Sequence, residues 1–231
     1  MESPSADEII RQMRTRASAK NRAGMAAFGI DTKTALGVSV TYLREIAKKR
    51  GLHNDHRLAL ALWKSNVHEA RILASIVDNP EEVDEGQMDE WVREFDSWDV
   101  CDQCCSNLFD KTRFAWSKTK EWSACEDEFV KRAGFAMMAV LASHDKEAQD
   151  EEFVALLPII ERAARDERNF VKKAVNWALR GIGKRNRALN ARAVGCAQRI
   201  AKKNPDSASA RWIAADAIRE LTSEKILARL D

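Results

Sequence analysis

Apolar side chains recur every three to four residues along nearly the whole chain, which is the spacing of one face of an α-helix. No stretch of useful length alternates apolar and polar residues as a half-buried strand does. The pattern therefore predicts an all-α protein. The expected helices cover residues 9–13 at the start of the first, then 43–51, 58–77, a short one ending at 92–95, 98–109, 129–141, 153–164, 169–182, 191–201 and a pair within 208–230.

Polar and small residues mark where the first helices begin and end. Ser and Thr side chains accept hydrogen bonds from the free N–H groups of a first helical turn, and Asp does the same. The glycines between residues 24 and 37 predict a connecting segment. The candidate N-caps are Ser5 or Asp7 for the first helix and Ser39 or Thr41 for the second.

Helices joined by short polar turns, in pairs of roughly 35 to 45 residues, predict an α-solenoid of HEAT-like repeats. Sequence similarity between the pairs is weak, so periodicity alone leaves a globular helical bundle open. No linker rich in Gly, Ser or Pro divides the chain. We therefore interpret residues 1–231 as a single domain.

Composition narrows the class further. Nine Gly and four Pro in 231 residues are few for a barrel or sandwich with many tight turns. No window approaches the roughly 18 apolar residues of a membrane span. The polar start of the chain lacks the apolar region of a signal peptide, and five irregularly spaced Cys do not form a disulfide framework. We expect a cytoplasmic monomer that does not associate with membranes.

The net charge of +2 results from two basic regions and an acidic region between them. Lys and Arg outnumber Asp and Glu by 13 to 7 in residues 1–77 and by 20 to 13 in residues 130–231, whereas residues 78–129 hold 5 against 16. Residues 168–205 contain eleven Lys and Arg and no acid. Such a stretch suits a polyanionic partner, although solvated helix faces explain any single charge run.

Two aromatic clusters are candidates for function. Trp98 and Asp102 are four residues apart, so they share a helix face, where an indole beside a carboxylate suits a cationic centre. The alternative is a helix start with Asp99 and Asp102 placed to suit the helix dipole. The residues of the second cluster follow its first member by four, seven and eleven positions, so they share one helix face. Its cations could bind phosphates, and its indole could contact a base or sugar. The alternative is a Trp that packs between repeats and is covered by the aliphatic parts of Lys and Arg side chains. The second cluster comprises Lys173, Trp177, Arg180 and Lys184.

Other motifs carry less chemistry. Cys101, Cys104 and Cys105 lack the further ligands that a closed zinc site needs, so we interpret them as core residues and expect no metal. Arg132 opens a helix that is otherwise small and apolar, and we expect it at the exposed end, with Met137 and Met138 in the core. The motifs of nucleotide hydrolases, dinucleotide enzymes, serine hydrolases and zinc hydrolases do not occur.

Taken together, five fragments in order resemble the AlkD-like DNA alkylation repair family of HEAT-repeat DNA glycosylases. They are Ala35-Leu36-Gly37-Val38-Ser39 with Leu43-Arg44-Glu45-Ile46-Ala47-Lys48, Leu62-Trp63 with His68-Glu69-Ala70-Arg71, Trp98-Asp99-x-x-Asp102, Arg132-Ala133, and Phe170-Val171-x-Lys173-Ala174-x-x-Trp177-x-Leu179-Arg180.

The resemblance implies a solenoid whose concave basic face binds double-stranded DNA containing alkylated purines. It implies removal of N3- or N7-alkylated purines without metal or organic cofactor and without a base-flipping pocket. Asp102 takes the place of the catalytic carboxylate, with Trp98, Trp177 and Arg132 around the lesion nucleotide. Ser39, Arg44 and Arg180 fall where family members contact the DNA backbone, and Lys173 and Lys184 extend that set of cations.

The chemistry is consistent with these residues. An N3- or N7-alkylated purine is already cationic, so it leaves as a neutral base without a strong general acid. A carboxylate such as Asp102 stabilises the oxocarbenium character of the sugar. The chain departs from the family in having Ser97 before Trp98 and in lacking a basic residue a little beyond Arg132. The alternative is therefore a HEAT-like DNA-binding or scaffold protein without glycosylase activity.

Overall fold

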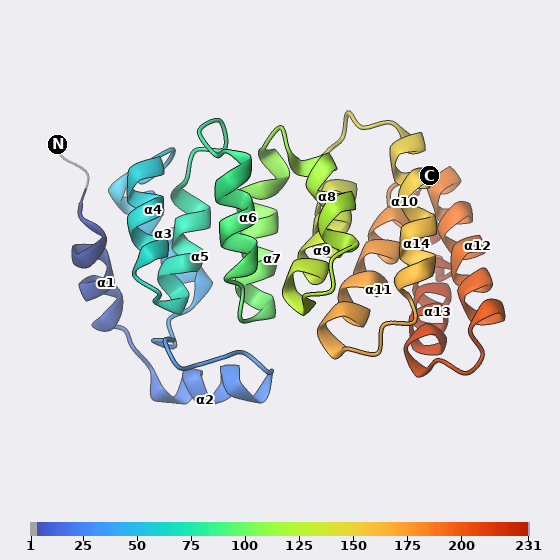
Figure 1. The fold of residues 1–231 in the computed structure, drawn as a ribbon, viewed down its shortest axis with the longest axis horizontal. Coiled ribbons are helices and arrows are strands. Elements are labelled where there is room, and N and C mark those ends of the chain that lie inside the picture. The colour runs from blue at the N-terminus through green and yellow to red at the C-terminus, as the bar shows by residue number, and fades with distance from the viewer. Residues whose placement is uncertain (1–3, 231) are drawn as a thin grey trace. The chain divides into compact units, whose positions relative to one another are not determined.

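A computed structural model describes residues 4–230, and every regular element in that range is a helix (Figure 1). The all-α prediction is confirmed. The chain divides into two compact units, Met1–Phe114 and Ala115–Asp231, and each is described by itself. The single-domain interpretation stays a prediction.

The described helices follow one another along the chain with these bounds. They are α1 (Ala6–Arg14), α2 (Ala19–Ala27), α3 (Val40–Arg50), α4 (His56–Lys64), α5 (His68–Val77), α6 (Glu85–Arg93), α7 (Trp98–Asn107), the 3-10 turn η1 (Phe109–Lys111), α8 (Ala115–Ser123), α9 (Glu128–His144), α10 (Asp150–Ala163), α11 (Asn169–Gly183), α12 (Arg187–Lys203), α13 (Ala208–Leu221) and α14 (Glu224–Leu227).

The N-terminal unit is built around α5, whose side chains are nearly all buried. Helices α3, α4 and α7 pack against α5, which therefore forms the centre of this unit. An aromatic cluster completes the core: the rings of Trp63 and Trp91 stack with centroids 4.0 Å apart, and Phe95 meets Trp63 edge-on. Such contacts add to the free energy gained from removing the rings from water.

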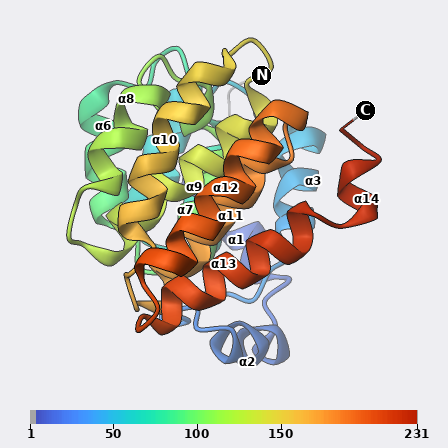
Figure 2. The same cartoon turned by 90° about the vertical axis from the view of Figure 1, so that its right-hand side faces the viewer.

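The C-terminal unit is held together by α9 and α11, which share the largest helix-to-helix contact within it (Figure 2). Small residues allow the close approach. A Cβ added to Gly181 of α11 would lie 3.2 Å from the Cα of Ala139 in α9, and one added to Gly134 of α9 would lie 2.3 Å from the backbone nitrogen of Ser123 in the neighbouring α8. Met137 and Met138 are fully buried, as predicted.

Polar contacts between successive helix pairs repeat at nearly constant sequence separations. In the N-terminal unit the contacts Leu36–Glu69, Trp63–Glu94, His68–Asp99 and Ser75–Asn107 span 31 to 33 residues. In the C-terminal unit Arg132–Phe170, Glu161–Arg199, Asn176–Asp216 and Arg180–Glu220 span 38 to 40. Each unit thus has its own repeat length.

The helix boundaries follow the capping predictions at the start of the chain. Ser5 accepts from the backbone N–H of Glu8 in a capping box, and Ser39 accepts from that of Tyr42. Thr41 lies inside α3 and Asp7 inside α1. At both helices two N-cap candidates were left open, and in each case the structure selects the serine, Ser5 or Ser39.

Three helix predictions are wrong in part. Residues 58–77 form two helices, because Asn66 adopts a left-handed conformation (φ 55°) that ends α4 before α5 begins. Helix α2 occupies part of the segment predicted as a connection, and its Gly24 has an open surface around it. Helix α8 was not predicted. Helix α2 buries none of its residues, and the buried side of α8 includes the polar residues Lys118, Thr119 and Ser123, so neither sequence shows an apolar periodicity.

Within residues 4–230, no helix is long and apolar enough to cross a membrane.

Glu69 provides a test of the N-terminal packing. Its buried carboxylate accepts hydrogen bonds from the backbone N–H groups of Leu36, Gly37 and Val38 at 2.8, 2.7 and 3.1 Å. We expect Glu69→Ala to lower the free energy of unfolding by about 3 kcal/mol in urea titrations, because buried donors are left without an acceptor. Glu45→Ala is the control, since that carboxylate is half exposed, and should change stability by about 0.5 kcal/mol or less. Equal effects of the two variants contradict this account.

Candidate nucleic-acid interface

The first turn of α7 presents Trp98 and Asp102 together. Val100, Cys101, Cys104 and Cys105 turn into the core of the N-terminal unit and fix the rotation of the helix. Trp98 and Asp102 are one turn apart and only half buried, so they lie on the side of α7 that solvent reaches. The structure thus brings the predicted indole and carboxylate to one surface.

A buried ion pair anchors this turn to the neighbouring helix pair. Nε2 of His68 lies 2.9 Å from Oδ2 of Asp99, and the His68 side chain is 2% exposed. Burial alone lowers the pKa of His68, but the hydrogen bond and charge of Asp99 outweigh it, and the pKa lies above its ordinary value of 6.5. Asp99 is therefore engaged in packing, whereas Asp102 lies on the outer side of the helix.

A hydrogen bond to the end of α2 holds the indole of Trp98. Its Nε1–H donates to the backbone carbonyl oxygen of Phe28, 3.1 Å away, at the end of α2. Helix α2 buries none of its own residues, and the Phe28 side chain is 74% exposed. Sequence reasoning missed this contact because the two residues are 70 positions apart and α2 was not predicted.

Arg44 reaches α7 next to the candidate carboxylate. Its Nη2 donates to Oε1 of Gln103 at 3.4 Å, and Asn107 donates to the same oxygen at 3.2 Å. Gln103 follows Asp102 directly in the chain. Arg44 remains exposed, so a cation lies on the surface of α7 next to the residue that follows Asp102. Gln103 was not among the predicted residues.

Ser39 lies at the start of α3, on the loop that Glu69 holds. Its hydroxyl oxygen caps the helix, and the residue is exposed. A hydroxyl that accepts one hydrogen bond still donates its own hydrogen, so Ser39 is suited to bind a phosphate oxygen. Two fragments of the sequence resemblance, the one around Gly37 and the one around Glu69, thus form a single structural feature.

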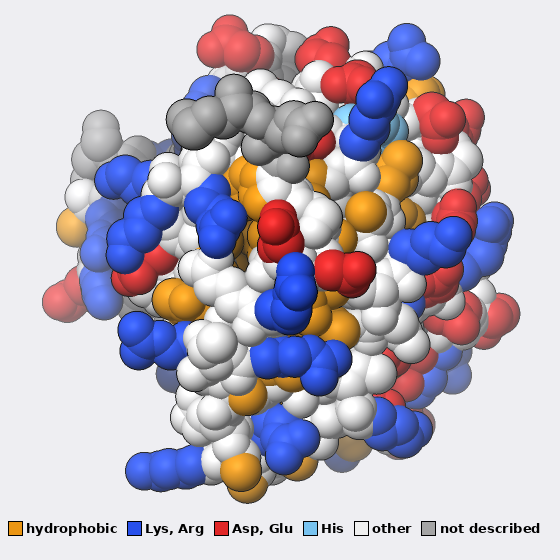
Figure 3. Space-filling model, turned by 90° about the vertical axis from the view of Figure 1, so that its left-hand side faces the viewer, with side chains coloured by type: hydrophobic (Ala, Val, Ile, Leu, Met, Phe, Trp, Pro, Cys, Tyr) orange, Lys and Arg blue, Asp and Glu red, His pale blue; other side chains and the backbone are white. Residues whose placement is uncertain are grey.

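The N-terminal unit carries further cations that the sequence analysis did not single out. Residues 9–30 contain no acid, and all five cations in that segment are exposed. Among residues 4–230, no carboxylate lies within ion-pairing distance of them. Figure 3 looks onto this end of the unit, where Lys and Arg side chains spread over much of the surface. The five are Arg11, Arg14, Arg16, Lys20 and Arg22.

In the C-terminal unit, the prediction for Arg132 needs correction. The residue is buried, with 5% of its surface exposed, and its Nη1 donates to the backbone carbonyl oxygen of Phe170 at 2.7 Å. The rings of Phe129 and Phe170 stack beside it, with centroids 5.5 Å apart. The start of α11 therefore covers Arg132, and this packing could not be read from the apolar sequence that follows it.

The predicted row on α11 is only partly a free basic surface. Lys173 is exposed and Trp177 is half buried. Arg180, however, pairs with Glu220 and lies 3.6 Å from Asp216, and Lys184 binds Glu220 at 2.9 Å. The acid-free stretch of sequence is thus partly neutralised by acids of α13, which the stacking of repeats brings alongside.

These ion pairs also lower the pKa values of the two acids on α13, Glu220 and Asp216. Burial raises the pKa of Glu220, but hydrogen bonds from Lys184 and Arg180 outweigh it and hold that pKa below its ordinary value. Burial likewise opposes ionisation of Asp216, and bonds from Asn176 and Arg219 overcome it. Both acids are therefore charged at neutral pH.

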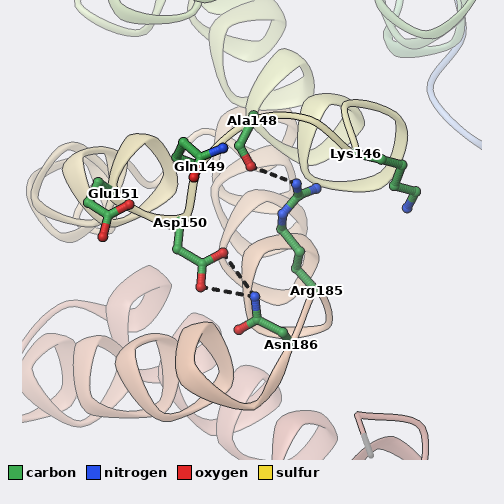
Figure 4. Close-up of a pocket in the computed structure, with 7 residues that line it drawn as sticks. All are labelled: Lys146, Ala148, Gln149, Asp150, Glu151, Arg185 and Asn186. Atoms are coloured by element: carbon green, nitrogen blue, oxygen red, sulfur yellow. Dashed lines mark hydrogen bonds between the residues drawn. The ribbon is translucent and has the colours of Figure 1, made fainter.

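An open hollow near α10 and α12 is explained by packing (Figure 4). Arg185 donates to the carbonyl oxygens of Asp145 and Ala148 and lies 4.5 Å from the ring centroid of Phe153. Asn186 caps α12 and also binds both oxygens of Asp150. Arg185 and Asn186, the polar side chains at the centre of this hollow, are thus engaged in holding the loop and the start of α10.

The cysteines are core residues. Cys101, Cys104, Cys105 and Cys196 are buried, and Cys125 is half buried. Burial raises the pKa of the Cys196 thiol to about 11, so it stays protonated. Within residues 4–230, no group of three or more His, Cys, Asp or Glu side chains is placed to hold a metal ion.

Comparison with known proteins supports the resemblance. The family model described as DNA alkylation repair enzyme matches residues 9–221. The chain belongs to this family. A solved structure described as "A new family of proteins related to the HEAT-like repeat DNA glycosylases with affinity for branched DNA structures" superimposes with a TM-score of 0.81, at 16% identity, over 98% of this chain and 96% of that one. None of the curated proteins matches in sequence.

The structural match confirms the fold prediction of HEAT-like helical repeats, as found in the repeat DNA glycosylases. The family assignment puts the chain in the functional class of the DNA alkylation repair enzymes. The individual roles of the site residues stay predictions.

The His68–Asp99 pair predicts a pH-dependent stability. Because the folded state raises the pKa of His68 above 6.5, this contribution is fully present below pH 6.5 and is lost as the pH rises through the raised value. We expect His68→Gln to destabilise the protein more at pH 6 than at pH 8.5 in urea titrations. His53→Gln, at an exposed histidine, should show no such difference. A His68→Gln penalty that is the same at both pH values contradicts the ion pair.

Proposed function

We propose that the protein is a DNA glycosylase that removes cationic N3- or N7-alkylated purines from duplex DNA, with Asp102 as the catalytic carboxylate. The observation that carries the proposal is the surface of α7. It presents Asp102 beside Trp98, with Arg44 bonded to the adjacent Gln103. A carboxylate, an aromatic ring and a cation on one surface match the needs of a sugar that becomes positive next to a phosphate.

The reaction breaks the bond between the sugar C1′ and the purine nitrogen. The electron pair leaves with the alkylated base, which becomes neutral, and positive charge develops on the sugar. Asp102 stabilises that charge, and a water molecule then attacks C1′ and loses a proton, leaving an abasic site. The leaving base needs no protonation, so we expect the reaction to proceed without metal or organic cofactor.

DNA binding is assigned to cations of both units. In the N-terminal unit these are Arg44, with Ser39 as a neutral phosphate ligand, and the five cations of residues 9–30. In the C-terminal unit Lys173 is free to bind phosphate, with Trp177 beside it on α11. Arg180 and Lys184 contribute less than the sequence suggested, because Glu220 competes for them. Arg132 is assigned a supporting role, since it is buried.

A second candidate is a DNA-binding protein without glycosylase activity. It is favoured by the relative described as having affinity for branched DNA structures and by the neutralised cations on α11. The two candidates differ in whether base is released from alkylated duplex, and both predict binding that weakens steeply with salt.

The catalytic role is tested by Asp102→Asn. This nearly isosteric change removes the charge, so single-turnover release of N7-methylguanine should slow by roughly 30- to 1,000-fold, the cost of about 2–4 kcal/mol of lost electrostatic stabilisation. Affinity for an uncleavable duplex should be unchanged or slightly higher, because a negative charge near DNA is removed.

Asp96→Asn is the matched control, since Asp96 is an exposed carboxylate just before the same helix. Its rate should equal that of the parent. If Asp102 merely favours the helix start, the Asn variant keeps its rate and loses about 1 kcal/mol or less of stability.

If the cations of α11 bind phosphates and Glu220 competes for them, removing a cation should weaken DNA binding and neutralising Glu220 should strengthen it. Lys173→Ala should weaken duplex binding and reduce the slope of log Kd against log salt by about one unit. Glu220→Gln should strengthen binding several-fold, because it frees Arg180 and Lys184 for phosphates. Fluorescence anisotropy at several salt concentrations measures both. Weaker binding by Glu220→Gln shows that the pair serves to position Arg180, contrary to this account.

A further inference from the structure

Three contacts form a ladder between α11 and α13, which lie side by side in the C-terminal unit (Figure 2). The side chain of Asn176 donates to Asp216 at 2.7 Å, and Arg180 donates to Glu220. One turn earlier, the ammonium of Lys172 lies 5.6 Å from the ring centroid of Trp212. Each rung joins residues 40 positions apart. The first rung differs from the others because it joins a cation to an aromatic ring.

Trp212 is unusual among the seven tryptophans, all of which lie in the described part of the chain. Its side chain is 41% exposed, whereas Trp63, Trp91 and Trp122 are at most 4% exposed and the other three are half buried. Ala208 lies one turn before it and Ala215 one turn after, and the charge of Asp216, also one turn after, is taken up by Asn176, Arg180 and Arg219. The indole is therefore accessible and not crowded by large side chains.

The charge around Trp212 suits an anion. Glu167, the nearest acid in the chain before α11, is engaged at the start of α13, where it accepts from the hydroxyl of Ser207 at 2.7 Å and from the backbone of Ser209. Among residues 4–230, no carboxylate is within ion-pairing distance of Lys172 or Lys173. Lys172 thus stands beside the ring, and the exposed Lys173 follows it on the helix that also carries Trp177.

We propose that Trp212 and Lys172 form a stacking platform for an unpaired nucleotide of DNA. The base stacks on the exposed indole, and Lys172 and Lys173 bind the phosphates on either side. Stacking on an aromatic ring serves any base, and the surrounding cations favour the nucleic-acid backbone. A paired base hides its faces in the helix, so the platform discriminates in favour of branch points and gaps. This inference rests on the proposed DNA binding and assigns it a second kind of substrate.

The experiment compares two DNA probes of equal length: a fully paired duplex, and a forked duplex with 2-aminopurine in its unpaired arm. We expect Trp212→Leu to weaken binding of the fork at least 5-fold, the lower end of a stacking contribution, and to abolish quenching of 2-aminopurine at that site. Trp212→Phe should retain most of both. Binding of the paired duplex, and release of alkylated base from it, should stay at parent levels for both variants.

Leu60→Ala, at another exposed apolar residue, is the control. Fork binding and quenching that survive Trp212→Leu overturn the platform, as does an equal loss for fork and duplex. Either result leaves the proposed function intact if the parent still acts on alkylated duplex. A parent that binds neither probe overturns the proposed function and this inference with it. If Trp212→Leu alters only capture of a protein partner, the ring is a protein-docking residue and the proposal is wrong.

Discussion

The contacts between successive helix pairs set the surface that each unit presents. A single helix pair leaves one apolar side uncovered, and the next pair covers it only in one register. That register is fixed by polar contacts at 31 to 33 residues in one unit and 38 to 40 in the other. Because His68 holds Asp99 and the cysteines hold the buried side of α7, Trp98 and Asp102 are left facing out.

The same register explains why charge counts along the sequence were an incomplete guide. The acid-free stretch of 38 residues, 168–205, is about one repeat long, and its neighbours in space come from the next repeat. Arg180 and Lys184 therefore meet Glu220, which lies outside the stretch. Residues 9–30 show the reverse: this acid-free segment is shorter, yet its five cations are exposed and none forms an ion pair with a carboxylate of the described residues.

Sequence alone predicted the all-helical class and the helices that carry Trp98, Asp102 and Trp177, because these helices bury apolar residues at helical spacing. It narrowed each of the first two N-caps to a pair of residues, and the structure selects the serine in both pairs. It missed α2 and α8, whose stripes are weak, and the break at Asn66, which depends on one left-handed residue. It also misplaced Arg132, whose burial depends on the position of Phe170 38 residues away. Contacts such as those of Phe28 with Trp98 or Arg44 with Gln103 carry no local signal.

The function follows from the same features. The family model places the chain among the DNA alkylation repair enzymes, and our proposal assigns the carboxylate on the α7 surface to glycosidic chemistry without a strong acid. The measurement that tests this most directly is incubation of the protein with a duplex carrying N7-methylguanine, scored for free base and for abasic sites. The account predicts release of the base and an equal number of abasic sites. Tight binding of the duplex with no release of base would contradict it.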